Sequence, residues 1–355
     1  SWVPHIPLAK ERLDVGPGVF GLALLAIAAG AVTAMPLTGA MINRYGSSRV
    51  SLVTGALFCI AFAGPVTAPT LVPFIIMGYL LGALIGSMDV AMNAHGIAVE
   101  RKLKRPIMSM LHGGFSVGGM VGAFLGAWAL KHMDEFTHIA LAGAACLILL
   151  FIAVRFLLPR SIDKGLSDTH FGWPTRATIG LGLLCFLALM AEGSVLDWSA
   201  IYFTAEFKVD AGTAGLGYAF FSGGMAASRF TGDWLRQKFG AVPMVVASAL
   251  LTAVSIALAV SVSSFVTAVV AFTFAGIGIG NIAPVLFAGG GRLEPDAPGR
   301  GIAAVTTLGY AGFLAGPPLI GFAAEVTSLG HAFWLVVLSA LSSPPLPPRL
   351  CLLYT

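Results

Sequence analysis

The chain has 355 residues, of which 57% are hydrophobic and 10% are charged, with a formal net charge of +4 and a mean hydropathy of +0.90. Soluble domains carry about 25% charged residues, so this chain has too few charges to cover a water-facing surface. Its basic residues lie in short connections between apolar runs, which argues against a nucleic-acid-binding patch. We therefore expect a helical protein that lies in a lipid bilayer.

The apolar residues form a series of segments that suit membrane-spanning helices. Such a helix takes roughly 20 apolar residues. The segment that begins at His331 is shorter than this because a proline-rich stretch follows it. The expected spans, in chain order, are residues 17–42, 49–66, 71–98, 107–130, 138–158, 177–204, 213–235, 241–260, 265–290, 301–325 and 331–341.

Lysine and arginine gather in alternate connections, and this asymmetry predicts the topology. Connections rich in these residues face the cytoplasm. The longest of them, residues 159–176, divides the chain near its middle, and we expect it to link an N-terminal bundle (1–158) to a C-terminal bundle (177–355). The basic residues that mark the cytoplasmic side are Arg44, Arg49, Arg101, Lys102, Lys104, Arg105, Arg160, Lys164, Arg176, Arg236, Lys238, Arg292 and Arg300.

The two halves also resemble each other in sequence, and such a repeat predicts two pseudo-symmetric bundles. It implies that a counterpart of the helix at 177–196 belongs before residue 1, and that the last helix should reach about residue 351. We therefore expect an all-α membrane protein derived from a 12-helix parent, with about 11 spans, a missing first helix and an altered C-terminal end. The matched residues, separated by 193–196 positions, include Thr38 and Thr231, Gly39 and Gly232, Gly82 and Gly276, and Trp2 and Trp198.

Two bundles joined by a cytoplasmic linker resemble the major facilitator superfamily. The first cytoplasmic loop carries the resemblance, because its sequence GAMINRYG is similar to the family pattern Gly-x-Leu-x-Asp-Arg-x-Gly. In the family this loop helps to lock the two halves in one conformation, and the resemblance gives Gly39, Asn43, Arg44 and Gly46 that role. Asn43 stands where the family has Asp, so the carboxylate of a charge-based lock is missing.

Two further runs narrow the resemblance. The sequences DVAMNAHG, which begins at Asp89, and EGSVLDW, which begins at Glu192, are similar to segments of bacterial fucose-permease-like members. The resemblance implies a multi-pass protein of the bacterial inner (cytoplasmic) membrane. It slightly favours a sugar or an organic acid as the solute.

Asp89 and Asn93 are candidates for the substrate and proton pathway. A carboxylate at membrane depth costs several kcal/mol unless it is paired or hydrated, so it is a functional hypothesis by default. Asp89 lies ~15 Å from the cytoplasmic end of its helix. Because Gly82, Gly86, Asp89 and Asn93 share one helix face, we expect Asp89 to face a crevice or a neighbouring helix. A purely structural carboxylate is the alternative.

His112 and Glu192 are further candidates. His112 lies six residues into the next helix, at a depth that differs from that of Asp89 by about 6 Å. A proton relay between the two is one interpretation, and a histidine satisfied by a backbone carbonyl is the other. Glu192 lies in the middle of the first helix of the second half, which lines the substrate path in the resembled family.

Three more polar residues interrupt apolar segments. Asp197 and Trp198 lie nearer the outer surface, where tryptophan commonly anchors a helix at the interface. We keep both as candidates for substrate contact. Arg229 either extends its charge to the membrane surface or pairs with Asp233 one turn on.

The sequence does not predict an enzyme. The glycine-rich runs around Gly113 and Gly276 lack the strand-then-helix context of a nucleotide loop. The sequence contains no recognisable nucleophile triad, metal cluster or ATP-binding motif, and its cysteines lack zinc-ligand spacing. We therefore expect no catalytic residue, no metal and no cofactor.

These observations together predict a secondary active transporter that moves a small organic solute by alternating access. Asp89 and Glu192 are the candidates for proton coupling. A multidrug efflux transporter, a non-transporting membrane receptor and an inactive fragment are the alternative hypotheses. We expect a monomer whose partners are the solute, protons and the bilayer, with no nucleic acid.

Overall fold

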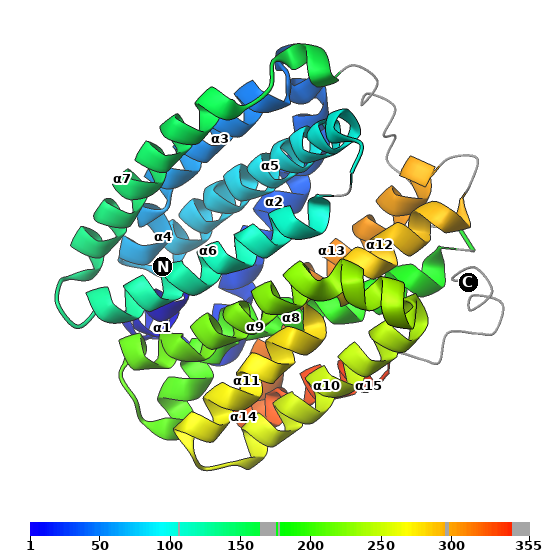
Figure 1. Ribbon diagram of the computed structural model, residues 1–355. Coiled ribbons are helices and arrows are strands. Elements are labelled where there is room, and N and C mark those ends of the chain that lie inside the picture. The colour runs from blue at the N-terminus through cyan, green and yellow to red at the C-terminus, as the bar shows by residue number, and fades with distance from the viewer. Residues whose placement is uncertain (106, 164–174, 177, 295–297, 343–355) are drawn as a thin grey trace.

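The computed structural model describes residues 1–342 apart from 106, 164–174, 177 and 295–297. Every regular element in this part is helical, and the helices gather into two bundles (Figure 1). Nine of the helices described are long and apolar enough to cross a membrane. The expected all-α membrane fold is confirmed. Most of the predicted linker, and the C-terminal tail from residue 343, lie outside the described residues.

The first bundle is drawn from blue to green in Figure 1. Its outer end begins with a short helix, and its long helices then alternate in direction between the two membrane faces. The elements are η1 (Val3–His5), α1 (Ile6–Leu13), α2 (Pro17–Tyr45), α3 (Ser47–Ala61), α4 (Ala63–Thr67), α5 (Leu71–Leu103), α6 (Met108–Ala129), α7 (Glu135–Ala153), η2 (Val154–Phe156) and η3 (Arg160–Asp163).

The second bundle contains the most deeply buried helices. Trp198, Tyr202 and Phe203 of its first helix are fully enclosed. Two predicted spans are divided into shorter helices, at Gly280-Asn281 and after Ala332. The elements are α8 (Ile179–Phe207), α9 (Ala211–Phe239), α10 (Ala241–Ser261), α11 (Phe265–Ile279), α12 (Ile282–Leu293), α13 (Pro298–Val326), α14 (Leu329–Ala332) and α15 (Trp334–Leu341).

Proline explains the break between α11 and α12. A proline has no backbone N–H and therefore cannot bond to the carbonyl four residues earlier. Pro284 leaves the carbonyl of Gly280 without its helical donor, and the Arg229 Nε donates to that carbonyl instead, at 3.1 Å. The break thus provides an acceptor for a charged side chain of α9.

Backbone-to-backbone contact sets the packing in both bundles. Glycines let α5 approach α2, and α11 approach α9, until the backbone of one helix touches that of the other. The contacts occur at equivalent positions of the two halves, which supports the sequence repeat. A Cβ atom would collide with a carbonyl oxygen at Gly30 (with Tyr79), at Gly82 (with Ile27), at Gly224 (with Thr273) and at Gly276 (with Phe221).

Two seams join the bundles, one between α2 and α13 and the other between α6 and α9. At the outer end of the first seam, the Glu325 carboxylate accepts a hydrogen bond from the Gly18 N–H at 2.8 Å. At the outer end of the second seam, the Lys131 ammonium lies 3.9 Å from the Asp210 carboxylate. The two halves therefore meet on the side opposite the linker through polar contacts in both seams.

Replacing Gly82 by alanine tests the close approach of α5 and α2. The added methyl would meet the Ile27 carbonyl, and we expect a loss of about 1–3 kcal/mol of stability, as for overpacking. Thermal unfolding of the purified protein in detergent measures the change. Gly114→Ala is the matched control, since no atom lies within 4 Å of that added methyl. Equal stability of the two variants would contradict the packing role of Gly82.

Candidate functional site

Asp89 connects the two bundles in the middle of the membrane-spanning region. Its Oδ2 accepts a hydrogen bond from the Tyr310 hydroxyl at 2.9 Å, and its Oδ1 accepts one from the Asn93 Nδ2 at 3.0 Å. Asp89 belongs to α5 and Tyr310 to α13, so the first bond crosses from one half to the other. The structure thus brings together the predicted pair of Asp89 and Asn93 and adds a partner from the second half.

Arg229 and Glu192 form a buried ion pair beside this contact. The Arg229 Nη2 lies 3.3 Å from the Glu192 Oε1, and the two side chains are 7% and 15% exposed. Arg229 also donates through Nη1 to the Ser116 Oγ at 2.7 Å. Breaking such a pair leaves an uncompensated charge in a low-dielectric region. The guanidinium therefore depends on partners from three helices.

The sequence-based pairing of Arg229 with Asp233 is wrong. Asp233 instead lies 3.9 Å from Arg236 at the exposed end of α9. A spacing of four residues allows contact along a helix, but here α6, α8 and the broken end of α11 supply partners in a more buried place. Arg229 also does not extend toward the membrane surface, because its side chain is enclosed.

Serine residues extend the polar contact along the α6–α9 seam. The Ser109 Oγ donates to the Arg229 carbonyl at 2.7 Å, and the Ser222 Oγ donates to the Ser116 carbonyl at 2.8 Å. These bonds join the two bundles next to the ion pair. The α6–α9 seam is thus held by buried hydrogen bonds, whereas α5 and α13 contact each other through Asp89 and Tyr310.

The two polar groups lie on helices that pack against each other. Glu192 of α8 pairs with Arg229 of α9, Asp89 of α5 bonds to Tyr310 of α13, and α8 packs directly against α13. We refer to Asp89, Asn93, Glu192, Arg229 and Tyr310 as the central polar cluster. It gathers side chains from four helices of both halves.

His112 does not join Asp89. Its side chain has no hydrogen bond in the described part of the chain. Similar depth along two helices does not specify which way each helix turns its side chains. The structure therefore does not place the predicted relay pair in contact.

Trp198 lies inside the protein and does not anchor α8 at the membrane surface. Its side chain is fully buried and packs edge-on against Phe20 with ring centroids 6.1 Å apart. The indole Nε1 has no hydrogen-bond partner within the described part of the protein. Asp197 is only partly buried, yet its carboxylate also has no partner among the described residues.

A carboxylate from a later segment of the chain binds the first cytoplasmic loop, whose own sequence has none at the expected position. Gly46 adopts a left-handed conformation with φ of +88° just before α3. The Asp163 carboxylate, from η3, accepts bonds from the Ser47 N–H at 2.8 Å and from the Ser47 Oγ at 2.6 Å. Arg160 donates to the Asn43 carbonyl at 2.7 Å. The chain after α7 therefore covers the loop, which the sequence analysis did not predict.

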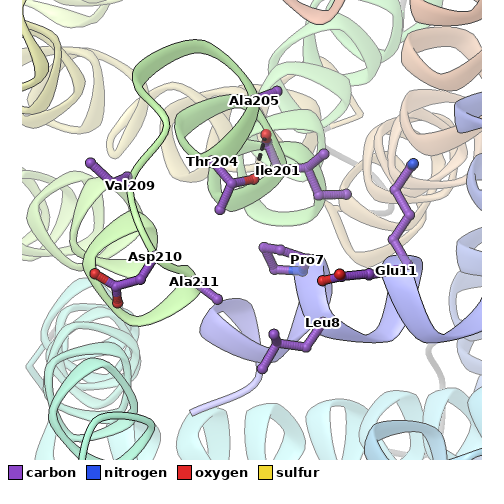
Figure 2. Close-up of a pocket in the computed structure, with 10 residues that line it drawn as sticks. Pro7, Leu8, Glu11, Ile201, Thr204, Ala205, Val209, Asp210 and Ala211 are labelled. Atoms are coloured by element: carbon purple, nitrogen blue, oxygen red, sulfur yellow. Dashed lines mark hydrogen bonds between the residues drawn. The ribbon is translucent and has the colours of Figure 1, made fainter.

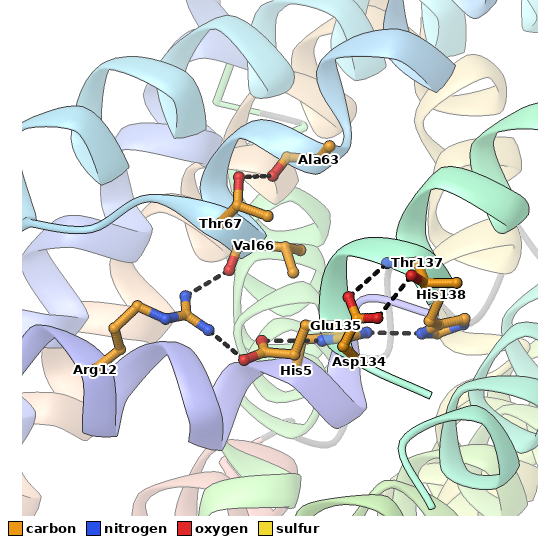
Figure 3. Close-up of polar contacts among 9 residues, drawn as sticks. All are labelled: His5, Arg12, Ala63, Val66, Thr67, Asp134, Glu135, Thr137 and His138. Atoms are coloured by element: carbon orange, nitrogen blue, oxygen red, sulfur yellow. Dashed lines mark hydrogen bonds and ion pairs between the residues drawn. The ribbon is translucent and has the colours of Figure 1, made fainter. Parts of the chain in front are cut away.

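A second polar cluster lies at the outer end of the first bundle (Figure 3). His5 contacts the His138 Nδ1 at 2.8 Å and the Glu135 carboxylate at 3.3 Å, and Arg12 pairs with the same carboxylate. Arg12 also donates to the Val66 carbonyl. All these residues belong to one half, so we interpret this cluster as a structural tie among α1, α4 and α7.

Comparison with known proteins gives a consistent result. The family model described as "Major Facilitator Superfamily" matches residues 3–176 and 181–348. The chain is 36% identical over 347 residues to an uncharacterized MFS-type transporter of Yersinia pestis, covering 96% of this chain and 89% of that protein. It is 30% identical to the membrane protein MosC of Rhizobium meliloti, covering 95% of this chain and 83% of MosC.

Solved structures share the fold at low sequence identity. A mutant of the nucleoside transporter NupG aligns with a TM-score of 0.74 and 12% identity, covering 100% of this chain and 95% of that one. The xylose transporter XylE from E. coli, in a partially occluded inward open conformation, aligns with a TM-score of 0.71 and 13% identity, covering 96% and 93%. These likenesses concern the fold.

Arg229→Gln tests the importance of the buried ion pair for stability. It leaves the Glu192 carboxylate without its cation, and we expect a loss of about 3 kcal/mol. Arg236→Gln, which removes an exposed pair of the same helix, should cost less than about 1 kcal/mol. Thermal unfolding in detergent compares the two. A cost for Arg236→Gln as large as that for Arg229→Gln would contradict the interpretation.

The outer histidine cluster predicts a loss of stability in acid. Burial lowers the pKa of His5 below its ordinary value of 6.5, because removal from water disfavours the imidazolium ion. The unfolded chain then binds more protons than the native state, so stability is full above pH 6.5 and falls as the pH drops below it. His5→Gln should weaken this dependence in pH-resolved thermal unfolding. His132→Gln, at an exposed site, should leave it unchanged, and identical profiles for all three proteins would refute the prediction.

Proposed function

Because the chain belongs to the major facilitator superfamily, it is a multi-pass secondary transporter and not an enzyme, and we propose that it carries a small polar organic solute in a proton-coupled cycle. The observation that carries this proposal is the central polar cluster, in which Asp89 and Tyr310 join the two halves at mid-depth. Solute sites of such transporters lie near the bilayer midplane between the two repeats. We further propose that the protein works as a monomer in the bacterial cytoplasmic membrane, as the fucose-permease-like resemblance implies.

The charges of the cluster bear on the class of solute. Asp89, Glu192 and Asp197 place three carboxylates in the spans, whereas Arg229 is the one buried Lys or Arg in the described part of the chain. A further anion would meet net repulsion, because like charges interact strongly in a low-dielectric region. Of the two solute classes that the sequence favours, this arrangement supports a sugar-like polyol over an organic acid. Its hydroxyls would exchange hydrogen bonds with Asp89, Asn93 and Tyr310.

Asp89 can couple a proton to the relative position of the two halves. As a carboxylate it accepts bonds from Tyr310 and Asn93 at the same time. A proton on Asp89 would remove the negative charge of the acceptor that Tyr310 uses. Because a hydrogen bond to a neutral group is weaker than one to a carboxylate, the contact between α5 and α13 would weaken. A proton bound in one conformation more tightly than in the other shifts the population of the two conformations. Proton binding at Asp89 would thereby favour separation of this seam.

Glu192 provides the second proton site of the proposal. Its contact with Arg229 at 3.3 Å is longer than a usual charge-assisted hydrogen bond, which measures about 2.7–2.9 Å. A solute hydroxyl can therefore compete for either partner. Arg229 would stay in place through Gly280 and Ser116 while Glu192 turns to the solute or takes a proton. His112, Asp197 and Trp198 complete the proposed pathway on either side.

The cytoplasmic loop supplies the proposed conformational element. Gly39 has no atom near the position of a Cβ, and Arg44 packs over the ring of Tyr45, 5.2 Å from its centroid. Asn43 and Gly46 are held by Arg160 and by the bonds around Asp163. We expect this loop to differ between conformations, with Asp163 in the role that the missing loop carboxylate would have.

Solute-driven proton movement in proteoliposomes tests the proposed function. Sugars, organic acids and cationic dyes form the panel, and a pH-sensitive dye reports the proton. We expect one solute class to drive proton movement, and Asp89→Asn to abolish it because the variant cannot exchange a proton. Asp233→Asn, at the exposed end of α9, is the matched control and should retain it.

Other outcomes would favour other functions. Broad movement of cationic dyes that is insensitive to Asp89→Asn would favour multidrug efflux. Solute binding without flux would favour a receptor. Proton-coupled flux that survives Asp89→Asn would assign Asp89 a structural role and leave Glu192 as the coupling residue.

A further inference from the structure

A pocket of about 480 Å³ lies at the outer side of the molecule, where the two halves meet. Its walls are α1 on one side and the end of α8 with the start of α9 on the other (Figure 2). Pro7 and Glu11 extend from α1 toward the middle, and Thr204 and Asp210 lie on the facing wall. The pocket is separate from the central polar cluster.

The rim of this pocket carries charges of both signs. Lys10 and Glu11 line it from α1, and Asp210 lines it from the α8–α9 connection. Asp210 caps the start of α9 through the Thr213 N–H at 2.9 Å and lies 3.9 Å from Lys131. The rim charges therefore offset one another, and any preference for a charged ligand must arise deeper in the structure.

The faces of α8 and α9 that line the pocket continue inward to two polar residues. Asp197, Ile201 and Thr204 follow a spacing of four and three residues, so they share one face of α8. Ile201 and Thr204 line the pocket, and Asp197 therefore lies one turn, ~6 Å, below its floor. On α9, Ala211 lines the pocket and Tyr218 lies two turns below it on the same face.

At the inner end of these faces of α8 and α9, polar groups lack hydrogen-bond partners. The Asp197 carboxylate has no hydrogen-bond or ion-pair partner among the described residues. The next two residues of α8, Trp198 and Ser199, are fully buried, and neither the indole Nε1 nor the hydroxyl has a partner there. The unpaired groups of Trp198 and Ser199 are buried and therefore costly, and such groups in a native structure call for a ligand, water or a second conformation. The partly buried Asp197 carboxylate, within a span, also needs a partner or water.

We propose that the outer pocket and Asp197 form the external binding site for a hydroxylated amine, with the Asp197 carboxylate as the receptor for its ammonium group. This inference rests on the proposed function and narrows its solute class from a polyol to a polyol that carries a positive charge. The ammonium supplies the counter-ion that Asp197 lacks, and an adjacent hydroxyl can accept a hydrogen bond from the Trp198 indole. The positive charge of the ligand would also be attracted to the central polar cluster farther along the path, where carboxylates outnumber basic side chains.

A ligand can move from the pocket to Asp197 only when the floor of the pocket opens. Ile201 of α8 lines the pocket, and Pro4 of η1 presses against Gly215 of α9. Pro4 belongs to the first half and Gly215 to the second, so separation of the halves at the outer end removes this contact. A ligand held at the rim would then reach Asp197 without crossing the bilayer.

Three probes that differ in one end group test the proposal. Glucamine, sorbitol and gluconate share a hydroxylated chain and end in an ammonium, a neutral hydroxymethyl and a carboxylate. Isothermal titration of the purified chain in detergent should give glucamine at least about tenfold tighter binding than sorbitol, as expected for a hydrogen bond to a charged group. Gluconate should bind more weakly than sorbitol.

Two variants test whether Asp197 causes the preference for glucamine over sorbitol. Asp197→Asn should reduce the glucamine-to-sorbitol ratio to about one, because the amide supplies no charge. It should also unfold at a higher temperature than the parent without ligand, since a carboxylate without a partner is removed from the span. Glu206→Gln, on the exposed end of α8, should leave the ratio unchanged.

Contrary results are equally clear. Equal affinities for glucamine and sorbitol, tighter binding of gluconate, absence of glucamine binding, or a preference that survives Asp197→Asn would each overturn the assignment. Flux of an uncharged polyol that depends on Asp89 but not on Asp197 would leave the proposed function standing and remove this inference. Glucamine binding through Asp197 without any flux would have the opposite effect.

Discussion

The fold depends on glycines that let one helix backbone touch another. In a bilayer no hydrophobic force drives helices together, and association relies on close packing and hydrogen bonds. At Gly82 the backbone of α5 meets the Ile27 carbonyl of α2, and at Gly276 the backbone of α11 meets the Phe221 carbonyl of α9. This contact sets the rotation of α5 about its axis. Asp89, seven residues beyond Gly82 on the same face, is consequently presented to the α2–α13 seam, where Tyr310 reaches it.

The two halves share their backbone packing but differ in their polar groups, and the candidate site arises from that difference. Arg229 has an acceptor in Gly280 because Pro284 removes the helical donor of that carbonyl. It has a second partner in Ser116 of the other half. The α6–α9 seam is therefore tied by buried hydrogen bonds close to Arg229, whereas Asp89 of α5 makes a titratable contact with Tyr310 of α13 next to the α2–α13 seam. An asymmetric pair of seams allows one side to respond to a proton while the other holds the halves together.

Periodicity and charge distribution were sufficient to predict the all-α membrane fold and the shared face of Asp89 and Asn93, and the loop motif was sufficient to predict the family. Nine of the 11 expected spans qualify within the described residues. These patterns failed where the partner of a residue comes from another helix. Helical spacing suggested Asp233 for Arg229, but Glu192, Ser116 and Gly280 are distant in sequence. A similar depth suggested His112 as a partner of Asp89, but depth does not specify the orientation of a side chain. Asp163 was missed because it lies after α7, far along the chain from the loop that it covers, and the pattern of that loop gives no signal for it.

The unpaired indole of Trp198 raises the free energy of the arrangement in which the outer ends of the two halves meet. A buried donor without an acceptor costs about 1–3 kcal/mol, which corresponds to a factor of roughly 5 to 150 in an equilibrium constant. The closed arrangement around its indole is therefore a shallower minimum than its aromatic packing alone would produce. A carrier whose two end states differ little in free energy passes between them readily in both directions. A closed state with one unpaired hydrogen-bond donor thus favours reversible exchange between the two conformations, whereas a closed state with every donor paired would oppose it.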